Sequence, residues 1–150
     1  MELWRYLIPD QIPTAEEINV YDSLDERNAV EHFLGKSISE AELLFRNHAN
    51  FHAEDLMWMG PKAFNYYILA AIRYIRSSAS LDDAFGVGGF LLAAKFQLEH
   101  CYQDIAESVP LIRDTVQYVL EHWDKFDFGS EYGQECRDRC SELQAMIECR

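Results

Sequence analysis

The segment from Asp55 to Arg76 constrains the fold of this chain more than any other. It contains the pair Gly60-Pro61, followed by a run rich in Ala, Ile, Leu and Tyr that is apolar around most of a helix. Proline suits the first turn of a helix, where its missing N–H leaves no hydrogen bond unmade. A helix that is apolar on nearly every side must be surrounded by others, because an exposed apolar face promotes aggregation. The segment therefore predicts a compact all-α domain around a central helix at about 61–76.

Length and composition limit the classes of protein to which this chain can belong. A chain of 150 residues can bury a core of its own, so we expect a single helical domain over residues 1–150, with residues 1–13 as an N-terminal arm. The hydrophobic share of 49% excludes a disordered chain. The N-terminus lacks the pattern of a secretory signal. The longest apolar run, Tyr66–Ile72, is far shorter than the roughly 20 residues of a membrane span. We expect a soluble cytoplasmic protein that does not contact a membrane.

Helix-start signals divide the chain into six to eight expected helices. The capping-box pattern, a hydroxyl residue followed three positions later by Glu, occurs at Thr14, Ser23 and Ser37. These boxes predict helices over about 14–21, 23–35 and 37–59, the last with a kink or restart near Asn47 and Asn50. Apolar spacing predicts further helices over about 61–76, 90–105, 110–123 and 131–148. Residues 77–89 are expected to form the longest loop, and no stretch predicts a convincing strand.

The net charge of −13 narrows the range of partners. A surface this negative repels the phosphates of nucleic acids and speeds association with a basic protein. We therefore expect a non-enzymatic, acidic protein-binding domain that does not bind nucleic acid. An acidic surface that serves solubility alone is the alternative. The residues expected to meet the partner are carboxylates near the N-terminus and one aromatic residue of the arm: Glu16, Glu17, Asp22, Asp25, Glu26, Glu31 and Trp4.

One pair of histidines offers a second function, a small metal-dependent enzyme. His48 and His52 are four residues apart, a spacing that places both imidazoles on one helix face and lets them bind a divalent metal. Glu54 and Asp55 follow as candidate ligands or bases. Ala49 occupies the position of the glutamate in His-Glu-x-x-His, which excludes a protease of that class. The alternative is two surface or half-buried histidines beside an acidic turn, with no cofactor.

The four cysteines and one glycine-rich run are also candidate metal and anion sites. The cysteines include no Cys-x-x-Cys pair and are expected to stay reduced, two of them as small buried hydrophobes; a metal pair is the alternative. Gly86–Gly89 (Gly-Val-Gly-Gly) precedes the helix expected from Phe90, where free amides can hold an anion. The strand of a nucleotide-binding loop is missing before it. We therefore favour a flexible turn that lets Phe90 pack.

Two blocks of the sequence carry a family resemblance. Residues 33–42, beginning Phe-Leu-Gly-Lys-Ser, and residues 55–67, beginning Asp-Leu-Met-Trp-Met-Gly-Pro, resemble a family of small bacterial proteins of unknown function over about Phe33 to Arg76. The resemblance implies a helical bacterial protein and assigns no catalytic residue. In size and charge the chain is also similar to immunity proteins, which implies an inhibitor that occludes a basic toxin. A homodimer through the aromatic-rich helices remains open.

Overall fold

The computed structural model describes residues 11–149, in which seven α-helices and three short 3-10 segments occur and strands do not. The helices are α1 (Ala15–Ile18), α2 (Leu24–Phe33), α3 (Ile38–Trp58), α4 (Pro61–Arg76), α5 (Ala84–Cys101), α6 (Val109–Glu121) and α7 (Glu131–Glu148). The 3-10 segments are Ser78–Ser80, Ala106–Ser108 and Trp123–Lys125. Trp4 and most of the predicted arm lie outside the described residues.

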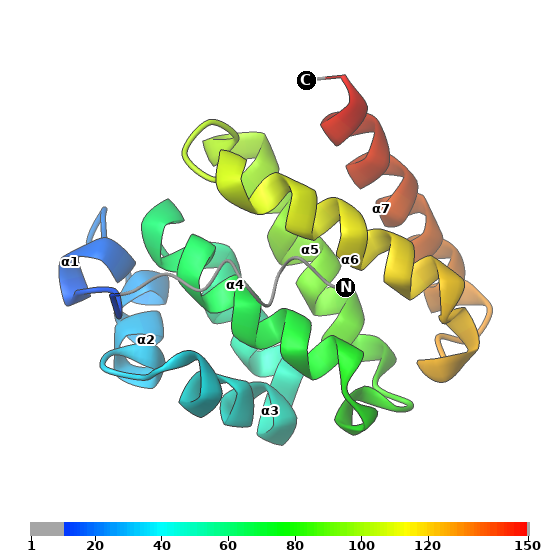
Figure 1. Ribbon diagram of the computed structural model, residues 1–150, viewed down its shortest axis with the longest axis horizontal. Coiled ribbons are helices and arrows are strands. Elements are labelled where there is room, and N and C mark those ends of the chain that lie inside the picture. Colours follow the sequence, from blue (N-terminus) through cyan, green and yellow to red (C-terminus); the bar gives the residue numbers. More distant parts are fainter. Residues whose placement is uncertain (1–10, 150) are drawn as a thin grey trace.

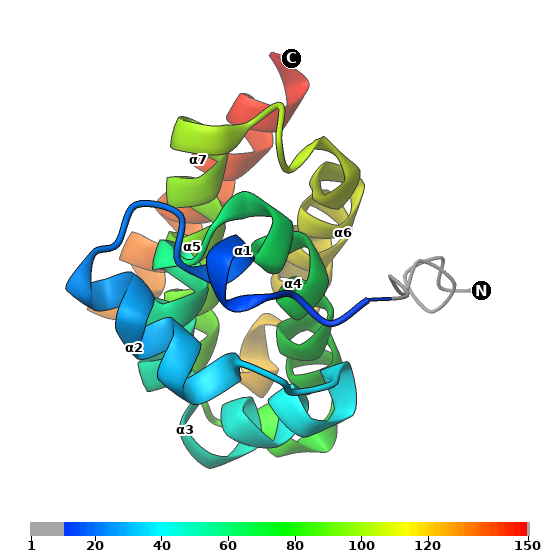
Figure 2. The ribbon, with the colours of Figure 1, turned by 90° about the vertical axis from the view of Figure 1, so that its left-hand side faces the viewer.

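The helices form a bundle in which α3 makes the most extensive contacts (Figure 1). It packs against both α4 and α5, while α6 and α7 pack on each other and α7 also packs on α5. At the other end of the bundle, α1 contacts α4 and α2 contacts α3 (Figure 2). None of the helices within residues 11–149 combines the length and apolarity needed to cross a membrane. The prediction of an all-α bundle of six to eight helices is confirmed.

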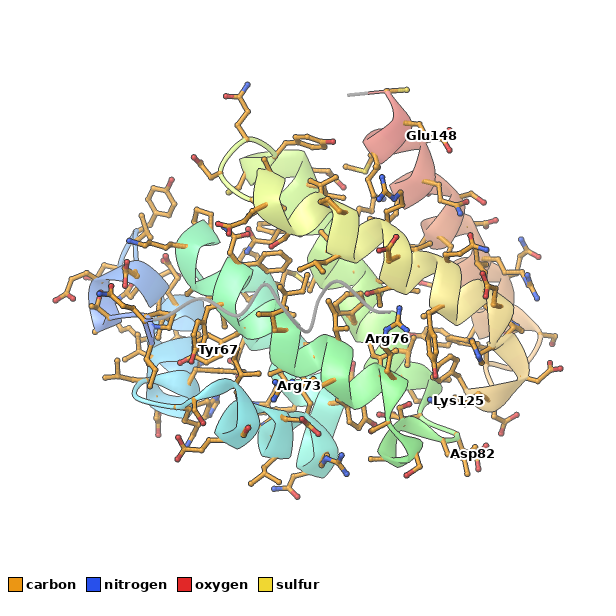
Figure 3. The ribbon with its side chains drawn as sticks, viewed as in Figure 1. Tyr67, Arg73, Arg76, Asp82, Lys125 and Glu148 are labelled. Atoms are coloured by element: carbon orange, nitrogen blue, oxygen red, sulfur yellow. The ribbon has the colours of Figure 1, made fainter. Side chains whose placement is uncertain are left out.

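The helix α4 lies in the core, as the apolar run after Pro61 predicts. Twelve of its sixteen residues are buried, on every side of the helix. Tyr67 is fully buried, and its hydroxyl donates to the carbonyl oxygens of Phe33 and Lys36, both at 2.9 Å. Figure 3 shows Tyr67 on the side of α4 that faces the turn between α2 and α3. One side chain thus holds that turn against the central helix.

All three predicted capping boxes are formed. In each, the hydroxyl accepts a hydrogen bond from the glutamate N–H and the glutamate carboxylate accepts one from the N–H of the hydroxyl residue: Thr14 with Glu17, Ser23 with Glu26, and Ser37 with Glu40. Gly35 has a φ of +78°, the left-handed conformation that lets the chain turn after α2. The first helix is shorter than expected, because it ends at Ile18 rather than near Tyr21. Local sequence signals therefore predict the starts of these three helices correctly, but they do not predict where α1 ends.

The Glu26 carboxylate stabilises the fold in a pH-dependent way. Burial alone would raise the pKa of Glu26, but hydrogen bonds from Ser23 and from the amides of Tyr21 and Val20 outweigh burial and lower it below the usual 4.5. A lowered folded-state pKa means that the stabilisation is complete above about pH 4.5 and is lost as the pH falls through the folded pKa. We expect Glu26→Gln to lower the free energy of unfolding by about 2 kcal/mol at pH 7. In urea denaturation the difference from the parent protein should shrink as the solution is acidified.

Glu31 provides the control for Glu26, since it lies on the same helix and is exposed. Glu31→Gln is expected to change the free energy of unfolding by less than about 0.5 kcal/mol. A Glu26→Gln penalty that stayed constant between neutral and acid pH would contradict the role assigned to the Glu26 charge.

The predicted loop over residues 77–89 is wrong in its second half. The helix α5 begins at Ala84, with the Asp83 carboxylate accepting the N–H of Gly86 at 3.1 Å as its cap. Gly86–Gly89 thus lies inside a helix, and neither the flexible turn nor the anion site before Phe90 exists there. The glycines instead allow close approach of neighbouring helices: a Cβ atom on Gly86 would lie 2.7 Å from the Cβ of Ala49 on α3.

Candidate functional site

Two hollows on the surface of residues 11–149 share the side chain of Trp58, the last residue of α3. The larger, here called the groove, has a volume of about 410 Å³ and is lined by Tyr21, Ser23, Glu26, Met57, Trp58, Met59, Gly60, Pro61, Phe96, Gln97, His100 and Cys101. The smaller, here called the polar hollow, has a volume of about 190 Å³ and is lined by Asp25, Asn28, His32, Phe51, Glu54, Asp55 and Trp58. Together these residues form what we call the Trp58 face.

Aromatic side chains make the groove largely apolar. The ring centroids of Trp58 and Phe96 are 4.9 Å apart, and those of Phe96 and His100 are 4.3 Å apart. Tyr21 lies at the groove with 84% of its surface exposed, although it is a large aromatic residue. Rigid aromatic side chains of this kind contribute much of the binding energy at protein interfaces. The groove therefore offers an anchor site for a large apolar side chain.

Gln97 supplies the main polar contacts beside the groove. Its amide Nε2 donates to the carbonyl oxygens of Leu56, Met57 and Met59 at 3.3, 3.0 and 2.9 Å, which holds the end of α3 against α5. Its Oε1 is buried and has no hydrogen-bond partner in the described part of the chain. This buried oxygen is thus an unsatisfied acceptor within the described part of the protein.

The Cys101 thiol at the groove is poorly suited to nucleophilic chemistry. Burial raises the pKa of this thiol, and the nearby Asp104 carboxylate raises it further. The thiolate is the reactive form of cysteine, so a raised pKa lowers reactivity at neutral pH. The groove has the character of a binding surface rather than of a site with an activated cysteine.

A cluster of two histidines and one aspartate lies at the polar hollow. The Oδ2 atom of Asp55 is 2.8 Å from Nδ1 of His32 and 3.0 Å from Nδ1 of His52. Asp55 and His52 are buried on α3, whereas the side chain of His32, on α2, is 26% exposed. Ligand atoms of all three residues lie within 4.8 Å of one another. The cluster joins α2 to α3 and contains the atoms that a metal ion would need.

The cluster differs from the metal ligands expected from the sequence. Asp55 and His52 belong to it, but His48 and Glu54 do not; both are exposed. At His48 the backbone leaves the helical conformation (φ −160°, ψ 76°), and its Nδ1 accepts the N–H of Phe51 at 3.2 Å. The kink expected near Asn47 and Asn50 is thus present, at His48 itself. The pairing of these two histidines as metal ligands assumed an unbroken helix, and His48 is not part of the cluster.

Sequence reasoning missed His32. One signal was available: Asp25, Asn28 and His32 are spaced i, i+3 and i+7, so they share one face of α2, and all three line the polar hollow. The contact between this face and Asp55 joins residues 23 positions apart in sequence. The spacing marks this face of α2, but its contact with Asp55 is set by helix packing and cannot be read from local spacing.

The carboxylates expected to meet a partner fall into different environments. Glu16, Asp22 and Glu31 are exposed, and Asp25 is half-buried beside the polar hollow. Glu17 forms an ion pair with Lys62 at 2.7 Å, and Asp22 forms one with Arg27 at 3.0 Å. Glu26 is buried (3% exposed) and accepts hydrogen bonds from Ser23 and from backbone amides. Glu26 therefore serves as the cap of α2, and only 3% of its surface is exposed.

No protein-family model matches the sequence, and no curated protein and no solved structure is detectably similar to it. The resemblance of residues 33–76 to small bacterial proteins stays a prediction.

Proposed function

We propose that this protein is a non-enzymatic binding domain that docks a basic segment of another protein on the Trp58 face. The observation that carries the proposal is an apolar groove next to a hollow with carboxylates at its edge. Among the described residues 11–149, the side chains lining the two hollows include Asp25, Glu54 and Asp55, together with the capping Glu26, but neither lysine nor arginine. Charges opposite to those of a partner speed its association, and an apolar pocket at the centre of the interface supplies binding energy once the partner is bound.

The chemistry of the partner follows from this arrangement. A large aromatic or aliphatic side chain would enter the groove beside Trp58 and Phe96, and neighbouring lysine or arginine side chains would meet Asp25 and Glu54. The net charge of −13 would speed the encounter and disfavour nucleic acids. The most specific form of the proposal is an immunity-like inhibitor in the bacterial cytoplasm that occludes a basic toxin; the four free cysteines of the chain fit a reducing compartment.

Peptide selection tests the proposal while the partner is still unidentified. Peptides selected from a random library on the immobilised protein should combine lysine or arginine with one large apolar residue. The double substitution Asp25→Lys/Glu54→Lys should weaken their binding at least about tenfold, because it places like charges opposite each other. Binding of these peptides to the parent protein should also weaken as the salt concentration rises.

A matched pair of substitutions separates the proposed site from the general negative charge. Asp114→Lys/Asp138→Lys makes the same change in net charge on α6 and α7, which contribute no residue to either hollow. This variant should bind the peptides as the parent protein does. Equal weakening by both double substitutions, or selected peptides without basic residues, would refute the proposal.

A further inference from the structure

We propose that His32, His52 and Asp55 bind one divalent transition-metal ion, with Zn²⁺ as the preferred ion. The inference does not depend on the proposed function, because it concerns an ion held between α2 and α3 rather than a protein partner.

The donor set is the first argument. Two imidazole nitrogens lie 2.8 and 3.0 Å from one carboxylate oxygen, and all three ligand atoms lie within 4.8 Å of one another. Two nitrogens and one oxygen suit Zn²⁺, whereas Mg²⁺ and Ca²⁺ prefer oxygen ligands alone. In a tetrahedral zinc site with bonds of about 2.0–2.1 Å, neighbouring ligand atoms lie about 3.3 Å apart. The two Nδ1–Oδ2 distances, 2.8 and 3.0 Å, would have to lengthen by about 0.5 and 0.3 Å to reach that spacing.

The surroundings of His52 are the second argument. Its ring lies edge-on to Phe51, Phe33 and Phe45, with centroid distances of 5.0, 5.9 and 6.4 Å. These contacts and the burial of His52 restrict the orientations of its imidazole. A ligand held in place before binding loses less conformational freedom when the ion arrives, which raises affinity.

The polar hollow supplies the third argument. Three protein ligands leave one coordination position of a tetrahedral ion for water or another group. His32 and Asp55 both line the polar hollow, and its other polar lining residues are Asp25, Asn28 and Glu54. The ion would therefore be reachable from solvent on the side of His32, whose side chain is 26% exposed.

A metal-free role for the same atoms is the competing explanation. If both imidazoles carry their proton on Nδ1, each can donate a hydrogen bond to Asp55 and so satisfy its buried carboxylate. The two explanations differ in one measurable property, because only a metal site saturates with one ion per chain.

Zinc titration of the chelator-treated protein tests the inference. Calorimetry should show one Zn²⁺ bound per chain, and the midpoint of thermal unfolding should rise with Zn²⁺ concentration. Co²⁺ in place of Zn²⁺ should give the visible absorption of a four-coordinate ion. His32→Ala should weaken Zn²⁺ binding more than about 100-fold, since even the loss of a residue that only orients a ligand costs up to about that factor.

His48→Ala is the matched control, because His48 is exposed on the same helix as His52 and lies outside the cluster. It should leave Zn²⁺ affinity unchanged. Asp55→Asn keeps the shape of the side chain, so it provides a second test if His32→Ala unfolds; it too should abolish tight binding. Absence of saturable binding at micromolar Zn²⁺, or equal losses in His48→Ala and His32→Ala, would overturn the inference. Neither result would affect peptide binding to the groove.

Discussion

Replacing Tyr67 by alanine is expected to lower the free energy of unfolding by about 4 kcal/mol. Tyr67 is fully buried on α4, and its ring centroid lies 4.9 Å from the ring centroids of both Phe33 and Tyr66. The substitution would leave a cavity between α4 and α2 and would remove the hydroxyl proton that two buried or half-buried carbonyls share. Urea denaturation measures the loss directly. In a chain of this size the thermal midpoint should fall by about 10 °C.

Two control substitutions show which part of Tyr67 matters. Tyr67→Phe keeps the ring and removes the hydroxyl, so it should cost about 1–3 kcal/mol through the unpaired carbonyls of Phe33 and Lys36. Tyr21→Ala removes the same side chain from an exposed position and should change stability by less than about 0.5 kcal/mol. If Tyr67→Ala cost no more than Tyr21→Ala, the view that the bundle is organised around α4 would be wrong.

The parts of the fold that the sequence predicts are those set by local contacts. A capping box joins residues three positions apart, so Thr14, Ser23 and Ser37 mark helix starts whatever surrounds them. Pro61 acts in the same way at the start of α4, and Gly35 after α2. The all-α class and the burial of α4 follow from these signals and the apolar pattern together.

The candidate site depends on contacts that local patterns do not encode. His32 reaches Asp55 because α2 packs on α3, and Trp58 meets Phe96 because α3 packs on α5. Among the residues predicted for a metal, His52 and Asp55 join the cluster, while Glu54 and His48, which lies at the kink, do not. The charge of Glu26 pointed to a partner, but its capping geometry directs it into the protein. Residue type indicated the candidate site residues, and helix packing determined which of them lie together.

The glycines of α5 show how packing can override helix propensity. Glycine costs about 1 kcal/mol in a helix relative to alanine, so Gly86–Gly89 predicts a loop. In the structure Gly86 and Gly89 face Ala49 and Ala53 of α3. Small residues on both helices let the backbones approach closely, and the contact between α3 and α5 is the most extensive between helices of the described chain. The gain in packing outweighs the weak propensity.

Gly86→Val is therefore expected to destabilise the protein by about 3 kcal/mol, although valine has the better helix propensity. Its Cβ would lie 2.7 Å from the Cβ of Ala49 and would also collide with the Asp83 carboxylate that caps α5. Urea denaturation of the Gly86→Val protein tests the expected loss. Adding Ala49→Gly removes one of the two collisions, so it should recover part of the lost stability in a double-mutant cycle.

The control for this cycle is Ala41→Gly, which makes the same change at another buried position of α3. It should recover nothing in the Gly86→Val background, because the atoms nearest to a Cβ at position 86 belong to Ala49 and Asp83 and not to Ala41. Selective recovery by Ala49→Gly would locate the penalty at the crossing of α3 and α5. A stabilising Gly86→Val substitution would instead mean that this segment is the loose turn its glycines suggest, and that α5 begins near Phe90.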